Sequence, residues 1–404
     1  MKQIQENHQG PSTFLAFALI PLSGFATDIY LPSLPSMASH LQVSGAAVQL
    51  SLVVFMISYG IGQLFVGSLL DSFGRFKLNI ASLAVFALAS FVIALTNNIY
   101  LIYLMRVIHG ITVAFIVVGK RAYFVDIYKG EKLKHYTSLF SIIWASAPII
   151  APFIGGYLQE TFGWQSNFYF LGILAFTFMV LELIFSGESL QQFHPFHLKT
   201  IVNVYSNILK TTDYTLGLVI LALCYSMLLV FGMSSPFIIE HLFHQTSVVT
   251  GYAALLSGVA LMAGGMLSKA LIKHPLIKKV STAILAMVLV AVLMIALSVY
   301  IHNLYILMPF VLLLHMFSGF IFNNYMSYSL GRFSKNAGMV SGITGGGNYV
   351  VTSILSYTVL NSVSIQNPMQ LGIAYLAIAA LLGITFMLFI KARYAQDATV
   401  LKPA

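Results

Sequence analysis

Arg106 is the first candidate for chemistry, because it is the only Lys or Arg deep inside a long apolar stretch. It lies in the segment L-M-R-V-I-H-G (residues 104–110), about two turns, or ~10 Å, from the start of that stretch at Ile99. A charged side chain inside hydrocarbon is costly, so it usually pairs within the protein or serves function. Arg106 is therefore a candidate for substrate binding or proton coupling. The structural alternative is a snorkelling arginine that reaches the outer surface.

Asp28 is the acidic counterpart. It lies in T-D-I-Y-L-P-S-L-P (residues 27–35), and we expect Pro32 and Pro35 to close the first apolar helix just beyond it, at its outer end. A carboxylate binds a proton more readily when buried and less readily beside an arginine. Movement between two such environments would make Asp28 a proton switch. A static cap or gate residue at the outer surface is the alternative.

His315 is the third candidate and lies near the middle of a later apolar stretch, 304–330. Gly319 and Asn323 follow at i+4 and i+8, so all three share one helix face. Histidine can titrate near physiological pH, so His315 and Asn323 are candidates for substrate or proton binding. Hydrogen-bonded packing is the alternative, and for His315 it is the favoured one.

A charged turn interrupts the apolar sequence at residues 67–77, G-S-L-L-D-S-F-G-R-F-K. It predicts a short loop at a membrane surface, because such charged groups are costly inside hydrocarbon. The residues that define this signature turn are Gly67, Asp71, Gly74, Arg75 and Lys77.

A second distinctive segment, residues 147–157, reads A-P-I-I-A-P-F-I-G-G-Y. Ala147, Ala151 and Gly155 recur every fourth residue, so one face of the helix is small enough for another helix to approach closely. Prolines within a helix remove backbone donors and favour a bend. The prolines here are Pro148 and Pro152, and a second glycine, Gly156, follows Gly155.

Composition defines the protein class. Of 404 residues, 59% are hydrophobic and only 8% are charged, against roughly a quarter in soluble domains. The single cysteine excludes a disulfide framework and most thiolate metal sites. The sequence has no G-x-x-x-x-G-K-[ST], H-E-x-x-H or G-x-S-x-G motif, which argues against an ATP-driven pump and against a hydrolase. We therefore expect a membrane protein that is not an enzyme and has no cofactor and no metal.

A membrane span needs about 20 apolar residues. By this measure the sequence predicts about twelve spans around a polar connection at residues 187–212, with six-helix halves at 1–186 and 213–404. The predicted spans are 13–33, 46–68, 78–96, 99–121, 136–158, 166–186, 213–236, 249–271, 281–300, 304–330, 338–360 and 369–391.

The basic residues predict the orientation. With cytoplasmic termini, the inner loops hold nearly all Lys and Arg, whereas the predicted outer loops, such as 97–98, 159–165, 302–303 and 361–368, hold none. The net charge of +9 is then a topology signal, and a nucleic-acid partner is not expected.

The signature turn closely resembles the loop between helices 2 and 3 of the major facilitator superfamily of transporters. Residues 104–110 are similar to that superfamily's helix 4 motif, with His109 in place of the usual glutamine. Residues 27–35 resemble its Bcr/CflA drug-resistance branch. Residues 147–157 resemble the antiporter motif of drug exporters, with Ala151 where glycine is usual.

The resemblance implies an all-α fold of twelve transmembrane helices in two halves around a central cavity, near which Asp28 and Arg106 lie close together. It also implies that helix 2 adjoins helix 11, so that Asp71 would meet the helix N-terminus near Gly338. That contact would favour closure of the inner side.

The function expected from these residues and this resemblance is proton-coupled efflux of small amphipathic compounds across a bacterial inner membrane. The resemblance implies drugs such as bicyclomycin or chloramphenicol, or a native metabolite such as a siderophore. Proton-symport uptake is the alternative, and a non-transporting membrane sensor is a third. The expected partners are a small-molecule substrate, protons and membrane lipid, with a monomer as the functional form.

Overall fold

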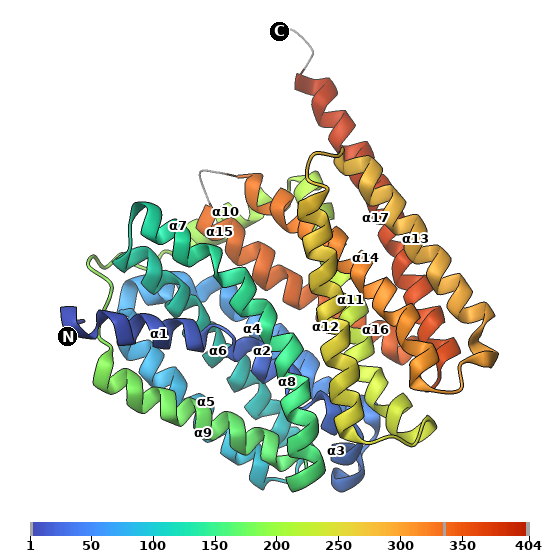
Figure 1. Ribbon diagram of the computed structural model, residues 1–404. Coiled ribbons are helices and arrows are strands. Elements are labelled where there is room, and N and C mark those ends of the chain that lie inside the picture. The colour runs from blue at the N-terminus through green and yellow to red at the C-terminus, as the bar shows by residue number, and fades with distance from the viewer. Residues whose placement is uncertain (1–2, 334–336, 401–404) are drawn as a thin grey trace. The chain divides into compact units, whose positions relative to one another are not determined.

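The computed structural model describes residues 3–333 and 337–400, and long helices dominate it (Figure 1). Within these ranges, ten helices or helical runs are long and apolar enough to cross a membrane. The other two predicted spans, 136–158 and 338–360, coincide with α8 (Phe140–Phe162) and with a continuous helical run over 337–363. Each predicted span therefore corresponds to a helix or to consecutive helices.

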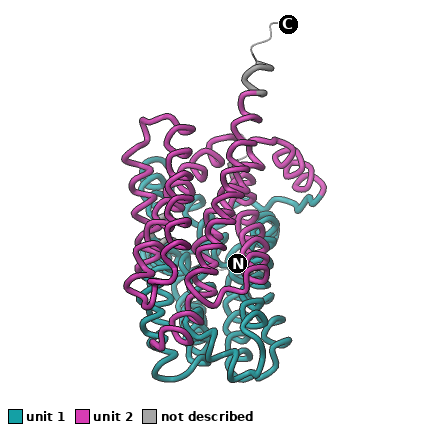
Figure 2. Tube along the Cα trace, turned by 90° about the vertical axis from the view of Figure 1, so that its right-hand side faces the viewer, with its two compact units in different colours: residues 1–198, 246–255 teal, residues 199–245, 256–404 magenta. Residues whose placement is uncertain are grey.

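The chain divides into two compact units, shown in different colours in Figure 2. Unit 1 contains residues 1–198 and 246–255, and unit 2 contains residues 199–245 and 256–404. The long helices of unit 1 are α1 (Gln9–Leu19), α2 (Leu22–Asp28), α3 (Leu34–Leu41), α4 (Gly45–Phe73), α5 (Arg75–Leu95), α6 (Ile99–Ile127), α7 (Gly130–Ser138), α8 and α9 (Gln165–Phe185).

Polar residues start several of these apolar helices. The Ser44 hydroxyl accepts a hydrogen bond from the Ala47 amide at the start of α4, and the Asn98 side chain accepts from the Tyr100 amide at the start of α6. Such caps satisfy amides that have no partner within the helix. α4 and α6 pack closely: a Cβ added at Gly110 would lie 2.0 Å from the Ser58 hydroxyl. Glycine therefore sets the distance between the two helices.

The first span differs from the prediction. The helical run continues through a 3₁₀ turn at Leu31–Ser33 into α3, so it ends at Leu41. Pro32 and Pro35 occupy first-turn positions of the 3₁₀ turn and of α3, where a missing amide costs nothing. The expectation that they close the helix beyond Asp28 is wrong. Asp28 lies inside the run, not at its outer end.

The signature turn is also shorter than expected. α4 continues through Asp71 to Phe73, and α5 begins at Arg75, so Gly74 alone separates the two helices. Gly74 has φ +91°, a left-handed conformation that only glycine adopts readily. This one residue reverses the chain, which is why no loop is needed.

The helices of unit 2 pack with equally close contacts. A Cβ added at Gly264 would lie 1.9 Å from the Met316 carbonyl oxygen, and one at Gly319 would lie 2.0 Å from that of Leu261. The helices are α10 (Leu198–Leu209, whose first residue belongs to unit 1), α11 (Thr212–Phe237), α12 (Ser247–Ala270, shared between the units), α13 (Leu276–Ala296), α14 (Leu304–Gly331), α15 (Ala337–Gly342), α16 (Asn348–Val363) and α17 (Pro368–Val400).

Candidate functional site

Arg106 is completely buried in unit 1 and is held by α2, by the turn that follows α2 and by α4. Its Nη1 donates to the Ala26 carbonyl at 2.9 Å, and its Nε donates to the Ser51 carbonyl at 3.4 Å. The guanidinium lies over the rings of Phe55 and Tyr30, at 4.2 and 4.7 Å from their centroids. Such cation–π contacts strengthen when desolvated. The side chain therefore does not snorkel to the protein surface.

Asp28 ends α2, two residues after the carbonyl to which Arg106 donates. It is 7% exposed, and its Oδ2 has no hydrogen-bond partner among the described residues. The Nη2 of Arg106 is likewise buried and without a partner in that part of the chain. Unpaired buried polar atoms are expensive in a protein interior. One acidic and one basic group thus share this region, each with an unused hydrogen-bonding atom.

His109 extends this polar cluster toward α5. Its Nδ1 is 3.5 Å from Arg106 Nη1, and its Nε2 is 3.0 Å from the Ser90 hydroxyl. Its ring stacks on Phe86, with 4.3 Å between centroids. His109, which stands in place of the usual glutamine of the helix 4 motif, is therefore in contact with Arg106.

The small residues of α8 contact two neighbours within unit 1. Ala147 and Ala151 are fully buried, and a Cβ added at Gly24 of α2 would lie 2.4 Å from that of Ala147. A Cβ at Gly155 would lie 1.6 Å from the Ile29 carbonyl oxygen, next to Asp28. The predicted close approach to another helix is therefore present, and the partner is the first helical run.

The second glycine of α8 and Pro152 face the start of α12, whereas Pro148 lies against Gly24 of α2. A Cβ at Gly156 would lie 2.6 Å from the Ser247 carbonyl oxygen, and one at Gly251 would lie 2.8 Å from that of Pro152. Both Pro148 and Pro152 lie within the helix. Whether this face serves export is still a prediction.

In the signature turn, Arg75 is the centre of an ionic cluster. It pairs through Nη2 with Asp71 at 2.9 Å and through Nη1 with Asp126, the penultimate residue of α6. Lys77 is exposed. Gly67 has no described atom within 4 Å of an added Cβ. The proposed meeting of Asp71 with the helix start near Gly338 stays a prediction.

Glu188, in the connection after α9, stabilises the same turn. Its carboxylate accepts from the amides of Arg75 and Phe76, both at 3.1 Å, and from that of Leu190 at 3.0 Å. A carboxylate at a helix N-terminus is favourable because the free amides and the helix dipole are positive there. Sequence reasoning missed both Glu188 and Asp126, since each lies far from the turn along the chain.

In unit 2, His315 joins four helices. Its Nδ1 lies 2.5 Å from the Ser257 hydroxyl of α12, and its Nε2 lies 3.1 Å from the Tyr375 hydroxyl of α17 and 3.3 Å from the Met227 carbonyl of α11. The residue is fully buried. Both ring nitrogens have partners, which favours the packing interpretation.

We expect His315→Ala to destabilise unit 2, because each buried polar partner left unsatisfied costs about 1–3 kcal/mol. The buried thiol of Cys224 gives the measurement, since a thiol-reactive dye labels it only on unfolding. The midpoint temperature of labelling should fall, whereas His302→Ala, at an exposed position, should leave it unchanged. Lost transport with an unchanged midpoint would instead support a direct role in binding.

Asn323 lies on the same face of α14 and donates through Nδ2 to the Gly265 carbonyl of α12 at 3.0 Å. His315, Gly319 and Asn323 thus all contact α12, as their spacing predicted for one face. At the end of α14, Arg332 donates to Asp213 of α11 at 2.8 Å, and this hydrogen bond raises the pKa of Arg332.

Comparisons with known proteins identify the family. The family model described as the Major Facilitator Superfamily matches residues 16–357. The uncharacterized MFS-type transporter YdgK of Bacillus subtilis is 29% identical over 258 residues, which cover 63% of this chain and 64% of that protein. The bicyclomycin resistance protein homolog of Haemophilus influenzae is 33% identical over 171 residues, or 41% of this chain and 43% of the relative. Both matches span less than two thirds of the relative.

The fold agrees with this assignment. The xylose transporter XylE from E. coli, in a partially occluded inward open conformation, aligns with 95% of this chain and 98% of its own, with a TM-score of 0.72 and 13% identity. That likeness confirms the predicted helical fold. The matched family model confirms the family that the sequence motifs indicated: the chain belongs to the Major Facilitator Superfamily.

Proposed function

We propose that the protein exports small amphipathic compounds in exchange for protons. The observation that carries the proposal is the burial of Asp28 and Arg106 in one region, each with an unused polar atom. A carboxylate that gains and loses a proton beside an arginine can change the contacts which that arginine makes. A polar group of the substrate would form hydrogen bonds with the same two atoms, Asp28 Oδ2 and Arg106 Nη2.

Similarity to a bicyclomycin resistance protein homolog supports bicyclomycin-like drugs as substrates. The small face of α8, which resembles the antiporter motif, supports export rather than uptake. We further propose a bacterial inner-membrane location with cytoplasmic termini, a monomeric functional form and a six-helix organisation of each half. A siderophore as native substrate stays a hypothesis with no support beyond the sequence resemblance.

The test uses purified protein in liposomes with radiolabelled bicyclomycin and a pH gradient of either sign. Proton-coupled exchange predicts accumulation in the more acidic compartment and proton release from it as drug enters. Symport predicts accumulation in the more alkaline compartment. No gradient-dependent movement of bicyclomycin or of a panel of chemically similar drugs would contradict the proposal.

The orientation gives a separate prediction. In a Cys224→Ser background, cysteines at Asn98 and Asn303 should react with an impermeant thiol reagent in intact cells. Cysteines at His135 and His274 should react only after the cells are opened. All four positions are exposed, so accessibility within the protein does not decide the outcome. The reverse pattern would contradict the orientation argued from Lys and Arg.

A further inference from the structure

A second buried polar cluster lies in unit 1, where α5, α6 and α9 meet. The Lys120 Nζ lies 2.5 Å from Glu182 Oε2, and Asn79 Nδ2 donates to the same oxygen at 3.4 Å. Glu182 is completely buried and Asn79 is 2% exposed. Ionisable groups buried in a membrane-spanning bundle are functional candidates by default. The described mechanism of Asp28 and Arg106 does not use them.

Two hydrogen-bond acceptors of this cluster are buried without a partner. Glu182 Oε1 and Asn79 Oδ1 are buried, and neither has a hydrogen-bond partner in the part of the chain that the structure describes. An ionised carboxyl group only accepts hydrogen bonds, whereas a protonated one also donates. A proton on Glu182 would therefore make this carboxyl group a donor as well as an acceptor.

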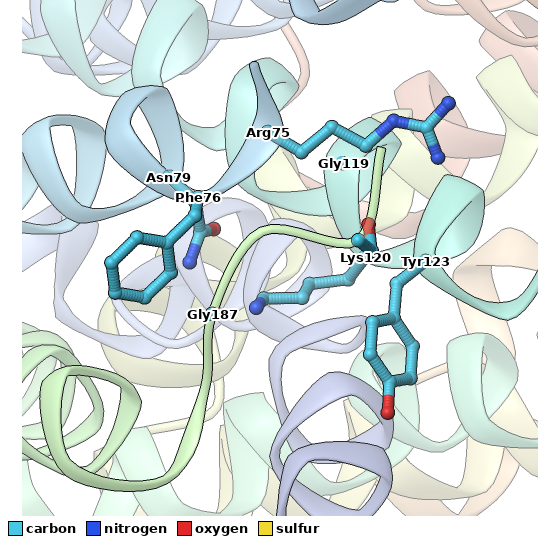
Figure 3. A pocket seen from close by; sticks show the side chains of 8 residues that line it. Arg75, Phe76, Asn79, Gly119, Lys120, Tyr123 and Gly187 are labelled. Atoms are coloured by element: carbon cyan, nitrogen blue, oxygen red, sulfur yellow. The ribbon is translucent and has the colours of Figure 1, made fainter. Parts of the chain in front are cut away.

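A pocket gives this cluster a route to protons. It is a small, partly open pocket, and Asn79 and Lys120 line it together with Arg75, Tyr123 and Ser189. Figure 3 shows the Lys120 side chain extending from α6 toward Asn79 while the connection carrying Gly187 crosses the pocket.

The charged groups around the pocket are balanced in number. The cations at this end of α5 and α6 are Arg75, Lys77, Lys120 and Arg121. Arg75 is paired with Asp71 and Asp126, and Lys120 is paired with Glu182. Glu188 adds a further carboxylate from the connection. With Asp71, Asp126 and Glu182 the region holds four carboxylates beside the four cations, and α1, which packs on α6 and α9, contributes no charged side chain. Two other titratable side chains lie nearby. The Tyr123 hydroxyl is hydrogen-bonded to the Thr13 hydroxyl, and the His8 ring packs edge-on against Phe185, one turn after Glu182.

We propose that Glu182, Asn79 and Lys120 form a proton-binding site distinct from Asp28, in which the Glu182 carboxyl holds the proton. The proton enters from water in the pocket and forms an O–H bond at Glu182. Lys120 is then released from its ion pair. The further step, that this proton is one of those exchanged for substrate, rests on the proposed function.

The test measures protonation directly and needs no substrate. Infrared difference spectra of the protein in liposomes, recorded as pH is lowered, should show the C=O band of a buried protonated carboxyl group that shifts in deuterated water. Glu182→Gln should remove the band. Asp28→Asn should retain it, and so should Glu131→Gln, whose ion pair with Lys134 is exposed. Persistence of the full band in Glu182→Gln would overturn the proposal.

Two measurements cover the case in which Glu182→Gln fails to fold. Isotope labelling of glutamate in the wild type should shift the same band, which assigns it to a glutamate without substitution. Lys120→Met should make the band appear at higher pH, because the neighbouring cation favours the ionised carboxylate. An unshifted band under glutamate labelling, or no dependence on Lys120, would overturn the assignment. These spectra do not measure transport. The assignment of the proton to Glu182 can therefore be tested even if the efflux proposal is wrong.

Discussion

Arg106→Ala should reduce transport by more than about tenfold while protein yield stays near that of the wild type. The variant loses hydrogen bonds to the Ala26 and Ser51 carbonyls and two cation–π contacts. A hydrogen bond to a charged group contributes about 1.5–3 kcal/mol, and ~1.4 kcal/mol corresponds to a factor of ten. The measurement is drug exchange in liposomes at equal pH on both sides. Without a pH gradient, the exchange rate reports substrate binding and transport and does not depend on proton coupling.

Arg106→Lys is the matched control for charge. Lysine keeps the positive charge but lacks the planar fork that donates in two directions at once and stacks on rings. It should recover little of the activity. Full activity of the alanine variant would show that Arg106 only supports packing, and full rescue by lysine would show that charge alone matters.

Gly155→Ala should destabilise the protein strongly, although the same change at most helical glycines is favourable. The added Cβ would lie 1.6 Å from the Ile29 carbonyl oxygen, so the backbone of α8 or of the first helical run must move. Overpacking of this kind costs about 1–3 kcal/mol, occasionally more. The midpoint temperature of thermal unfolding, followed by the loss of helical circular dichroism, should fall, and the yield of folded protein should fall with it.

Gly67→Ala is the matched control, because nothing described lies within 4 Å of its added Cβ. In a helix interior, alanine is more favourable than glycine by about 1 kcal/mol. The two identical substitutions should therefore shift the midpoint in opposite directions. A shift of the same sign at both sites would mean that the contact between α8 and Ile29 is looser than the structure indicates.

Helix positions were the most predictable part of this molecule. Twenty-residue apolar stretches are long enough to be recognised one at a time, and each predicted span coincides with a helix or helical run. Boundaries failed where a polar or proline-containing segment continued the helix. Pro32 and Pro35 start short helices instead of ending one, and Asp71 lies in the last turns of α4.

Individual charged residues were found when they stood alone in an apolar stretch. Arg106 and Asp28 were recognised in this way, and the structure places both in one region. Glu182, Lys120 and Asp126 were not proposed as site residues, because each lies near the end of a predicted span, where a charged side chain usually reaches water. Their burial depends on neighbouring helices, which single-sequence periodicity does not reveal.

The one-residue reversal at Gly74 leaves no spare chain between α4 and α5. Neither helix can slide along its axis or rotate without carrying the other, because there is no loop to absorb the difference. Added residues would have to form a loop beside Arg75 and would displace the Glu188 carboxylate, which lies 2.8 Å from an added Cβ at Gly74. The two helices should therefore move together, and a tag inserted at Gly74 should be poorly tolerated.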